Sequence, residues 1–104
     1  ECRVGGSDIN PYLAMAVQLA AGLAGIEEKL ELGAPFKGDA YSGDEGMIPT
    51  NLRDAYASLK GSKMLRRTLG DDVVDHYARA AEVEIEDFDA VVTDYEIARG
   101  FERC

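Results

Sequence analysis

The chain has 104 residues and a mass of 11.3 kDa, the size of one domain or of part of one. Its apolar fraction of 46% and charged fraction of 30% exclude a disordered tail, a collagen-like repeat and a disulfide scaffold. Eleven basic against twenty acidic residues give a net charge of −9, which disfavours nucleic acid and anionic membranes as partners because like charges repel.

The sequence shows neither a membrane-spanning apolar run nor a signal-peptide pattern. Cys2 and Cys104 lie at opposite ends of the chain, so we expect two free thiols in the cytoplasm. The chain opens on Glu1 without an initiator methionine, which favours a segment of a longer protein.

The first quarter of the chain predicts a strand end, a turn and a helix. Polar and apolar residues alternate over Glu1–Val4, which predicts the end of a strand, and Gly5-Gly6 predicts a turn after it. Asn10 can cap a helix that begins at Pro11. From residue 11 to residue 26 this helix is apolar on every face, so it should be buried on every face. The rest of the chain offers too little surface to cover it, so we expect an apolar patch and self-association of the isolated chain.

Glycines and prolines make residues 32–49 a loop. Thr50 is then predicted to cap a second helix that Gly61 ends, with apolar residues at helical spacing, namely Leu52, Ala55, Tyr56 and Leu59. Ser62 should cap a short third helix that ends at Gly70.

A long fourth helix is predicted to begin at Asp71-Asp72, because acidic residues are favourable at the positive end of a helix. One apolar stripe is expected to hold Val73, Val74, Tyr77, Ala81, Ile85 and Phe88. A solvated acidic face is expected to hold Glu82, Glu84, Glu86, Asp87 and Asp89. Thr93 and Glu96 form a capping-box pattern, which predicts a short last helix. The fold class is therefore mostly α with one short N-terminal strand.

The residues alone do not reveal a complete active site. His76 is the only histidine, and a structural or surface role is expected because metal sites need several ligands. On this basis the chain could be a free-standing acidic helical interaction module without catalysis, whose helices enter a partner's groove.

Several motifs resemble the glutamine synthetase family in order along the whole chain. The family's E-x-R strand is matched by Glu1-x-Arg3, and its A-N-P-Y-L-A and A-G-L-x-G-I motifs by residues 9–14 and 21–26, with Ile9 in place of the usual alanine. Looser matches follow at residues 40–41, 48–52, 69–77 and 93–96. The last of these, Thr93-Asp94-Tyr95-Glu96, resembles the T-D-W-E ending of the branch that includes γ-glutamyl-polyamine synthetases.

The resemblance implies the C-terminal segment of an α+β catalytic domain, over residues 1–104, from an enzyme that is a homo-oligomer. Such enzymes use ATP and Mg²⁺ or Mn²⁺ to phosphorylate the γ-carboxylate of glutamate, and ammonia or an amine then displaces the phosphate. By this resemblance Glu1 is a metal ligand, and Arg3 is catalytic and contacts the phosphate and the acyl intermediate. These roles agree with general chemistry, because Mg²⁺ and Mn²⁺ prefer carboxylate oxygen and a guanidinium matches the charge of a transferring phosphoryl group. Residues two apart on a strand point to the same face, so Glu1 and Arg3 can reach one ligand. The segment alone should be inactive, and Tyr41 lies near the loop tyrosine that some members modify.

Overall fold

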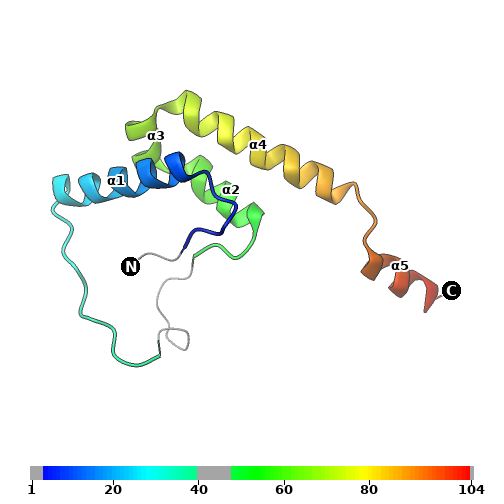
Figure 1. The fold of residues 1–104 in the computed structure, drawn as a ribbon. Coiled ribbons are helices and arrows are strands. Elements are labelled where there is room, and N and C mark those ends of the chain that lie inside the picture. The colour runs from blue at the N-terminus through cyan, green and yellow to red at the C-terminus, as the bar shows by residue number, and fades with distance from the viewer. Residues whose placement is uncertain (1–3, 40–47, 104) are drawn as a thin grey trace.

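The computed structural model describes residues 4–39 and 48–103. These residues form five helices, α1 (Pro11–Glu27), α2 (Leu52–Gly61), α3 (Lys63–Leu69), α4 (Asp71–Asp89) and α5 (Asp94–Phe101) (Figure 1). The mostly helical fold class is confirmed. No strand occurs among the described residues, and the strand expected over Glu1–Val4 falls on a segment of which only Val4 is described.

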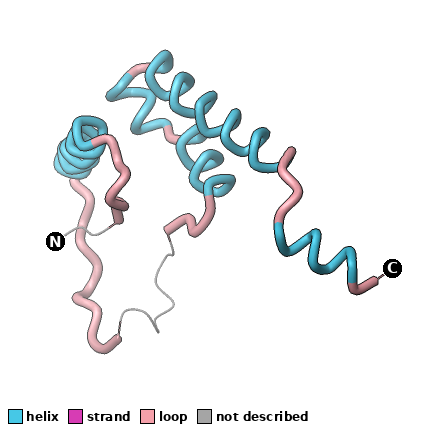
Figure 2. The backbone as a smooth tube through the Cα atoms, turned by 45° about the vertical axis from the view of Figure 1, so that its right-hand side comes forward, coloured by secondary structure: helices cyan, strands magenta, loops and turns pink. Residues whose placement is uncertain are grey.

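Helices α2, α3 and α4 form a hairpin in which α2 and α4 run antiparallel and α3 makes the corner (Figures 1 and 2). An ion pair joins Arg53 at the start of α2 to Asp89 at the end of α4. Farther along, the Tyr56 hydroxyl donates to Oε1 of Glu82 at 3.2 Å. Within the predicted apolar stripe of α4, Val74 is buried with 1% of its surface exposed, and Tyr77, Ala81 and Ile85 are half-buried. Ala78 is also buried, although it was not predicted to belong to this stripe.

Two parts of the predicted pattern on α4 are wrong. Val73 and Phe88 were expected in the apolar stripe, yet Val73 is 38% exposed and Phe88 is 67% exposed. Glu82 was expected on a solvated face, yet it is half-buried and accepts a hydrogen bond from Tyr56 of α2. Asp89 is exposed, as expected, and pairs with Arg53. Position on the helix alone did not reveal these partners, because they lie 26 and 36 residues away in the sequence.

The corner between α3 and α4 depends on Gly70 and Arg66. Gly70 has a φ of 87°, in the left-handed region that favours glycine, and it ends α3 as predicted. The Arg66 guanidinium spans the corner, with Nη1 2.8 Å from Oδ1 of Asp71 and Nη2 2.7 Å from Oδ1 of Asp75. Its Nε donates to the Lys60 carbonyl at 3.1 Å, so one side chain ties α2, α3 and α4 together.

Most of the predicted helix caps are confirmed. The Asn10 side chain accepts from the backbone N–H of Tyr12, Ser62 caps α3, and Thr93 with Glu96 forms the capping box of α5. The cap predicted at Thr50 is wrong by one residue. Oδ1 of Asn51 accepts from the Asp54 N–H at 2.9 Å, because Asn51 holds the extended backbone that a cap requires.

Helix α1 has few contacts with the hairpin. It buries only the small side chains of Ala20 and Ala24, and it packs against α3. Nη2 of Arg67 lies 2.9 Å from Oε1 of Glu28 and joins the end of α1 to α3. α5 stands away from the other helices in both views (Figures 1 and 2). The radius of gyration is accordingly 18.2 Å, against about 13 Å for a compact chain of this length.

Candidate functional site

The two residues predicted to carry chemistry, Glu1 and Arg3, lie outside the described residues, as do Tyr41 and both cysteines. The description starts at Val4, directly after Arg3. The described residues that follow them in the sequence are residues 4–10.

This segment and the first turns of α1 line a groove of about 540 Å³. Its lining is mostly apolar and consists of Val4, Gly5, Ile9, Asn10, Leu13, Ala14, Val17 and Gln18. The backbone turns between Gly6 and Ile9, whose N–H donates to the Gly6 carbonyl at 3.5 Å. The segment that follows Arg3 thus lies along the start of α1.

The contact between Ile9 and Gly5 in this groove was not anticipated from the sequence. A Cβ added at Gly5 would lie 2.8 Å from Cδ1 of Ile9, closer than van der Waals contact allows. One signal was present at this place, since Ile9 replaces the alanine of the motif that residues 9–14 resemble.

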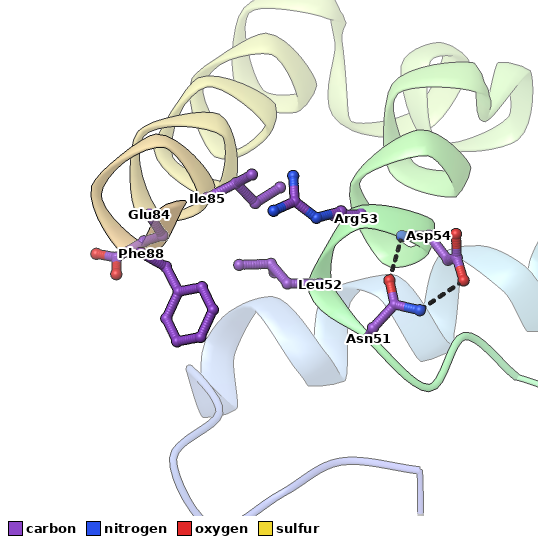
Figure 3. Close-up of a pocket in the computed structure, with 7 residues that line it drawn as sticks. All are labelled: Asn51, Leu52, Arg53, Asp54, Glu84, Ile85 and Phe88. Atoms are coloured by element: carbon purple, nitrogen blue, oxygen red, sulfur yellow. Dashed lines mark hydrogen bonds between the residues drawn. The ribbon is translucent and has the colours of Figure 1, made fainter. Parts of the chain in front are cut away.

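A second groove, of about 620 Å³, lies between the start of α2 and the last turns of α4 (Figure 3). Leu52, Ile85 and Phe88 form its apolar wall. Its polar groups are largely engaged with each other. Nδ2 of Asn51 donates to Oδ2 of Asp54 at 2.7 Å, and Arg53 pairs with Asp89. This arrangement supports the helix packing and presents no group poised for catalysis.

Several of the shifted pKa values belong to hydrogen bonds and ion pairs of the hairpin. A hydrogen bond from Arg79 lowers the pKa of Glu82, and the Tyr56 hydroxyl contributes to the same effect. A hydrogen bond from Arg66 likewise lowers the pKa of Asp75. The hydrogen bond to Tyr56 raises the pKa of Lys60. All these groups are at the surface between helices, so their shifts indicate structural pairing rather than a catalytic centre.

No group of three or more His, Cys, Asp or Glu side chains that could hold a metal ion occurs within residues 4–39 and 48–103. His76 packs edge-to-face on Tyr77, with ring centroids 5.3 Å apart, which agrees with a structural or surface role. Within the described residues no helix is long and apolar enough to cross a membrane.

Comparison with known families identifies the chain. The model of the glutamine synthetase catalytic domain matches residues 1–100. The chain belongs to the glutamine synthetase family. The resemblance inferred from Glu1-x-Arg3 and the motifs that follow it is thereby confirmed.

Individual relatives of the family fall into two kinds. The chain is 50% identical over 103 residues to a gamma-glutamylethanolamide synthetase of Streptomyces coelicolor, covering 99% of this chain and 22% of the relative. It is 36% identical over 107 residues to a glutamine synthetase of Methanosarcina mazei, and this match covers 95% of the chain and 24% of the relative. It is 35% identical over 102 residues to a glutamate–isopropylamine ligase of a Pseudomonas species, and this match covers 95% of the chain and 22% of the relative. The chain thus spans less than a quarter of the length of these relatives.

Proposed function

We propose that the protein carrying this chain is an ATP-dependent ligase that joins ammonia or an amine to the γ-carboxyl of glutamate. The observation that carries the proposal is the match of the glutamine synthetase catalytic domain to residues 1–100. In the net reaction ATP, glutamate and amine give ADP, phosphate and a γ-glutamylamide. We further propose a homo-oligomer that works in the cytoplasm.

In this proposal Glu1 and Arg3 have separate roles. Glu1 supplies one carboxylate oxygen to Mg²⁺ or Mn²⁺, a donor that these cations prefer. The metal, when bound, neutralises charge on the phosphates. Arg3 directs its guanidinium to the transferred phosphoryl group, where planar donors match the phosphate oxygens. The chain alone should be inactive, because its described residues hold no group of three or more His, Cys, Asp or Glu side chains that could bind the metal.

An amine larger than ammonia is the acceptor that we favour. The Streptomyces relative is named for an ethanolamide product, and the Pseudomonas relative is named for ligating isopropylamine to glutamate. The ending Thr93-Asp94-Tyr95-Glu96 points to the same branch, although the structure places it on the scaffold, where Thr93 and Glu96 cap α5.

The test is an assay of the full-length protein with ATP, Mg²⁺ and glutamate against ammonia, ethanolamine, isopropylamine and a polyamine. We expect phosphate release and a γ-glutamylamide that mass spectrometry detects, with an amine preferred over ammonia. Arg3→Lys should lower kcat by about 100-fold or more, because one point charge replaces a bidentate donor. Arg103→Lys, near the far end of the chain, is the control. Preference for ammonia would contradict the choice of acceptor. Absence of product with every amine would contradict the ligase and favour the interaction module.

A further inference from the structure

Helix α1 exposes its large side chains along one line. These side chains follow one another at intervals of three or four residues, a spacing that puts them on the same face of a helix. They form the α1 stripe, which consists of Tyr12, Met15, Leu19, Leu23 and Ile26. Each of them is at least 58% exposed, whereas Leu13 and Val17, the other large apolar side chains of the helix, are half-buried.

The contact between α1 and α3 leaves this stripe free. The buried residues of α1 are Ala20 and Ala24. With 3.6 residues in each helical turn, these two alanines lie roughly a third of a turn away from the middle of the stripe. The stripe is therefore a second packing face, and the hairpin does not use it.

Gly22 lies beside the stripe and adds a second observation. A Cβ at this position would meet nothing within 4 Å, and Gly22 is not among the described glycines with positive φ. Glycine inside a helix is less stable than alanine, so nothing within the described residues accounts for it. A position without a side chain allows another surface to approach the helix backbone closely.

Charge and chain length indicate what covers the stripe. Residues 11–26 carry no charged side chain, although the chain has a net charge of −9, so the stripe suits an uncharged apolar surface. A second copy would bring the same net charge, which disfavours its approach. The chain spans less than a quarter of the length of its relatives, so most of a family member lies outside it. A covalently attached surface acts at an effective concentration of about millimolar, which exceeds that of a separate micromolar chain.

We propose that the α1 stripe docks this chain onto the rest of its own polypeptide, which covers the stripe with an uncharged apolar surface. A second copy takes that place only where the rest of the polypeptide is missing. The inference goes beyond the proposed ligase function, and its test needs no catalytic activity.

The first measurement is the oxidation of Met15 by dilute peroxide in the full-length protein, followed by mass spectrometry. Met64 of α3 is half-buried and serves as the internal reference. Each rate is divided by the rate of the same methionine in the urea-unfolded protein, because oxidation follows exposure. An open stripe would leave Met15 the more reactive of the two, since it is 63% exposed. We expect the covered Met15 to react at least about tenfold more slowly than Met64.

The second measurement identifies the covering surface. A photoreactive benzoylphenylalanine replaces Tyr12 in the full-length protein, where one aromatic side chain takes the place of another. After irradiation, we expect a cross-link within one polypeptide, to a peptide outside residues 1–104. The same group at Gln18 is the matched control, because Gln18 lies about 100° round the helix from Leu19 and should give far fewer links.

A third measurement uses the open space at Gly22. Gly22→Leu meets no atom within this chain, so any effect in the full-length protein comes from the covering surface. It should reduce the protection of Met15 by about tenfold. Gly61→Leu is the control, because a Cβ at Gly61 also meets nothing within 4 Å.

Several results would overturn the proposal while the ligase function stands. Met15 that reacts as fast as Met64 would show an open stripe. A cross-linked species of two chains would identify a second copy as the occupant, and links confined to residues 1–104 would identify the chain itself. Equal links from Tyr12 and Gln18, or wild-type protection of Met15 in Gly22→Leu, would show that the stripe is not the docking face. A protein that lacks ligase activity but gives the expected protection and links overturns only the proposed function.

Discussion

The α2–α4 hairpin and helix α1 differ in residue composition and in how much of their apolar surface is buried. In the hairpin, apolar side chains such as Val74 are buried and charged ones such as Arg66 are paired across helices. Helix α1 is apolar all round, yet it buries only Ala20 and Ala24. Its large side chains stay exposed, among them Tyr12, Met15, Leu19, Leu23 and Ile26.

The difference shows which part of the chain is complete by itself. The hairpin has inside the chain the partners that its buried and charged groups need. Helix α1 has an exposed fraction of 65% at Leu19 and 77% at Ile26, which is typical of a surface that packs against something else. The chain spans 22% of the Streptomyces relative, so most of a family member's surface lies outside it. We therefore expect mutations in the hairpin to act on folding and mutations on α1 to act on association.

The largest effect is expected at Val74, the most buried of the large side chains in the hairpin. Val74→Asp puts an unpaired carboxylate between α4 and its neighbours and should lower the free energy of unfolding by about 3–5 kcal/mol. Val73→Asp is the matched control, because Val73 is next to Val74 in the sequence but is 38% exposed and lies near the positive end of α4. Chemical denaturation measures both. Equal losses in the two variants would show that the hairpin has no specific core.

The second effect concerns α1 and the predicted self-association. The 104-residue chain should form a dimer at micromolar concentration, since its exposed apolar face is free to pair. Leu19→Lys with Leu23→Lys should weaken that dimer by at least about tenfold, or about 1.4 kcal/mol. Leu32→Lys is the control, because Leu32 is exposed but lies in the loop after α1. Analytical ultracentrifugation distinguishes the outcomes, and an 11 kDa monomer of the wild-type chain would contradict the prediction.

The features predicted correctly from the sequence are local ones. Helix starts at Asn10, Ser62 and Thr93 follow from side chains that bond to backbone within three residues, so the sequence contains both partners. The apolar character of α1 was also evident. What was missed depends on residues far apart in the chain, such as the pairing of Glu82 with Tyr56. The cap at Asn51 was missed because Thr50 beside it is also a common capping residue, although asparagine is the stronger one.

The candidate site was predictable only by resemblance. Glu1 and Arg3 are two charged residues with no distinguishing local pattern of their own, and the motif that follows them is what identifies their family. The contact of Ile9 with Gly5 was not predictable, because it depends on how tightly the turn between them closes. Periodicity and capping rules describe helices and do not describe such a turn.

The smallest effect expected within the hairpin is the pH dependence of the Arg66–Asp75 pair. Arg66 lowers the pKa of Asp75 below its usual value of 3.8 by a hydrogen bond. A carboxylate whose pKa is lower in the folded state adds stability above its unfolded pKa, and that stability is lost as the pH falls through the folded pKa. Asp75→Asn should therefore make stability less steeply dependent on pH below about 4.

Asp72→Asn is the control, because no ion pair involves Asp72 among the described residues. Both partners are solvent-accessible, so salt should screen the difference. Melting temperatures across this acidic range at low and high salt would test it, and identical profiles for the two variants at low salt would show that Arg66 holds the corner by geometry alone.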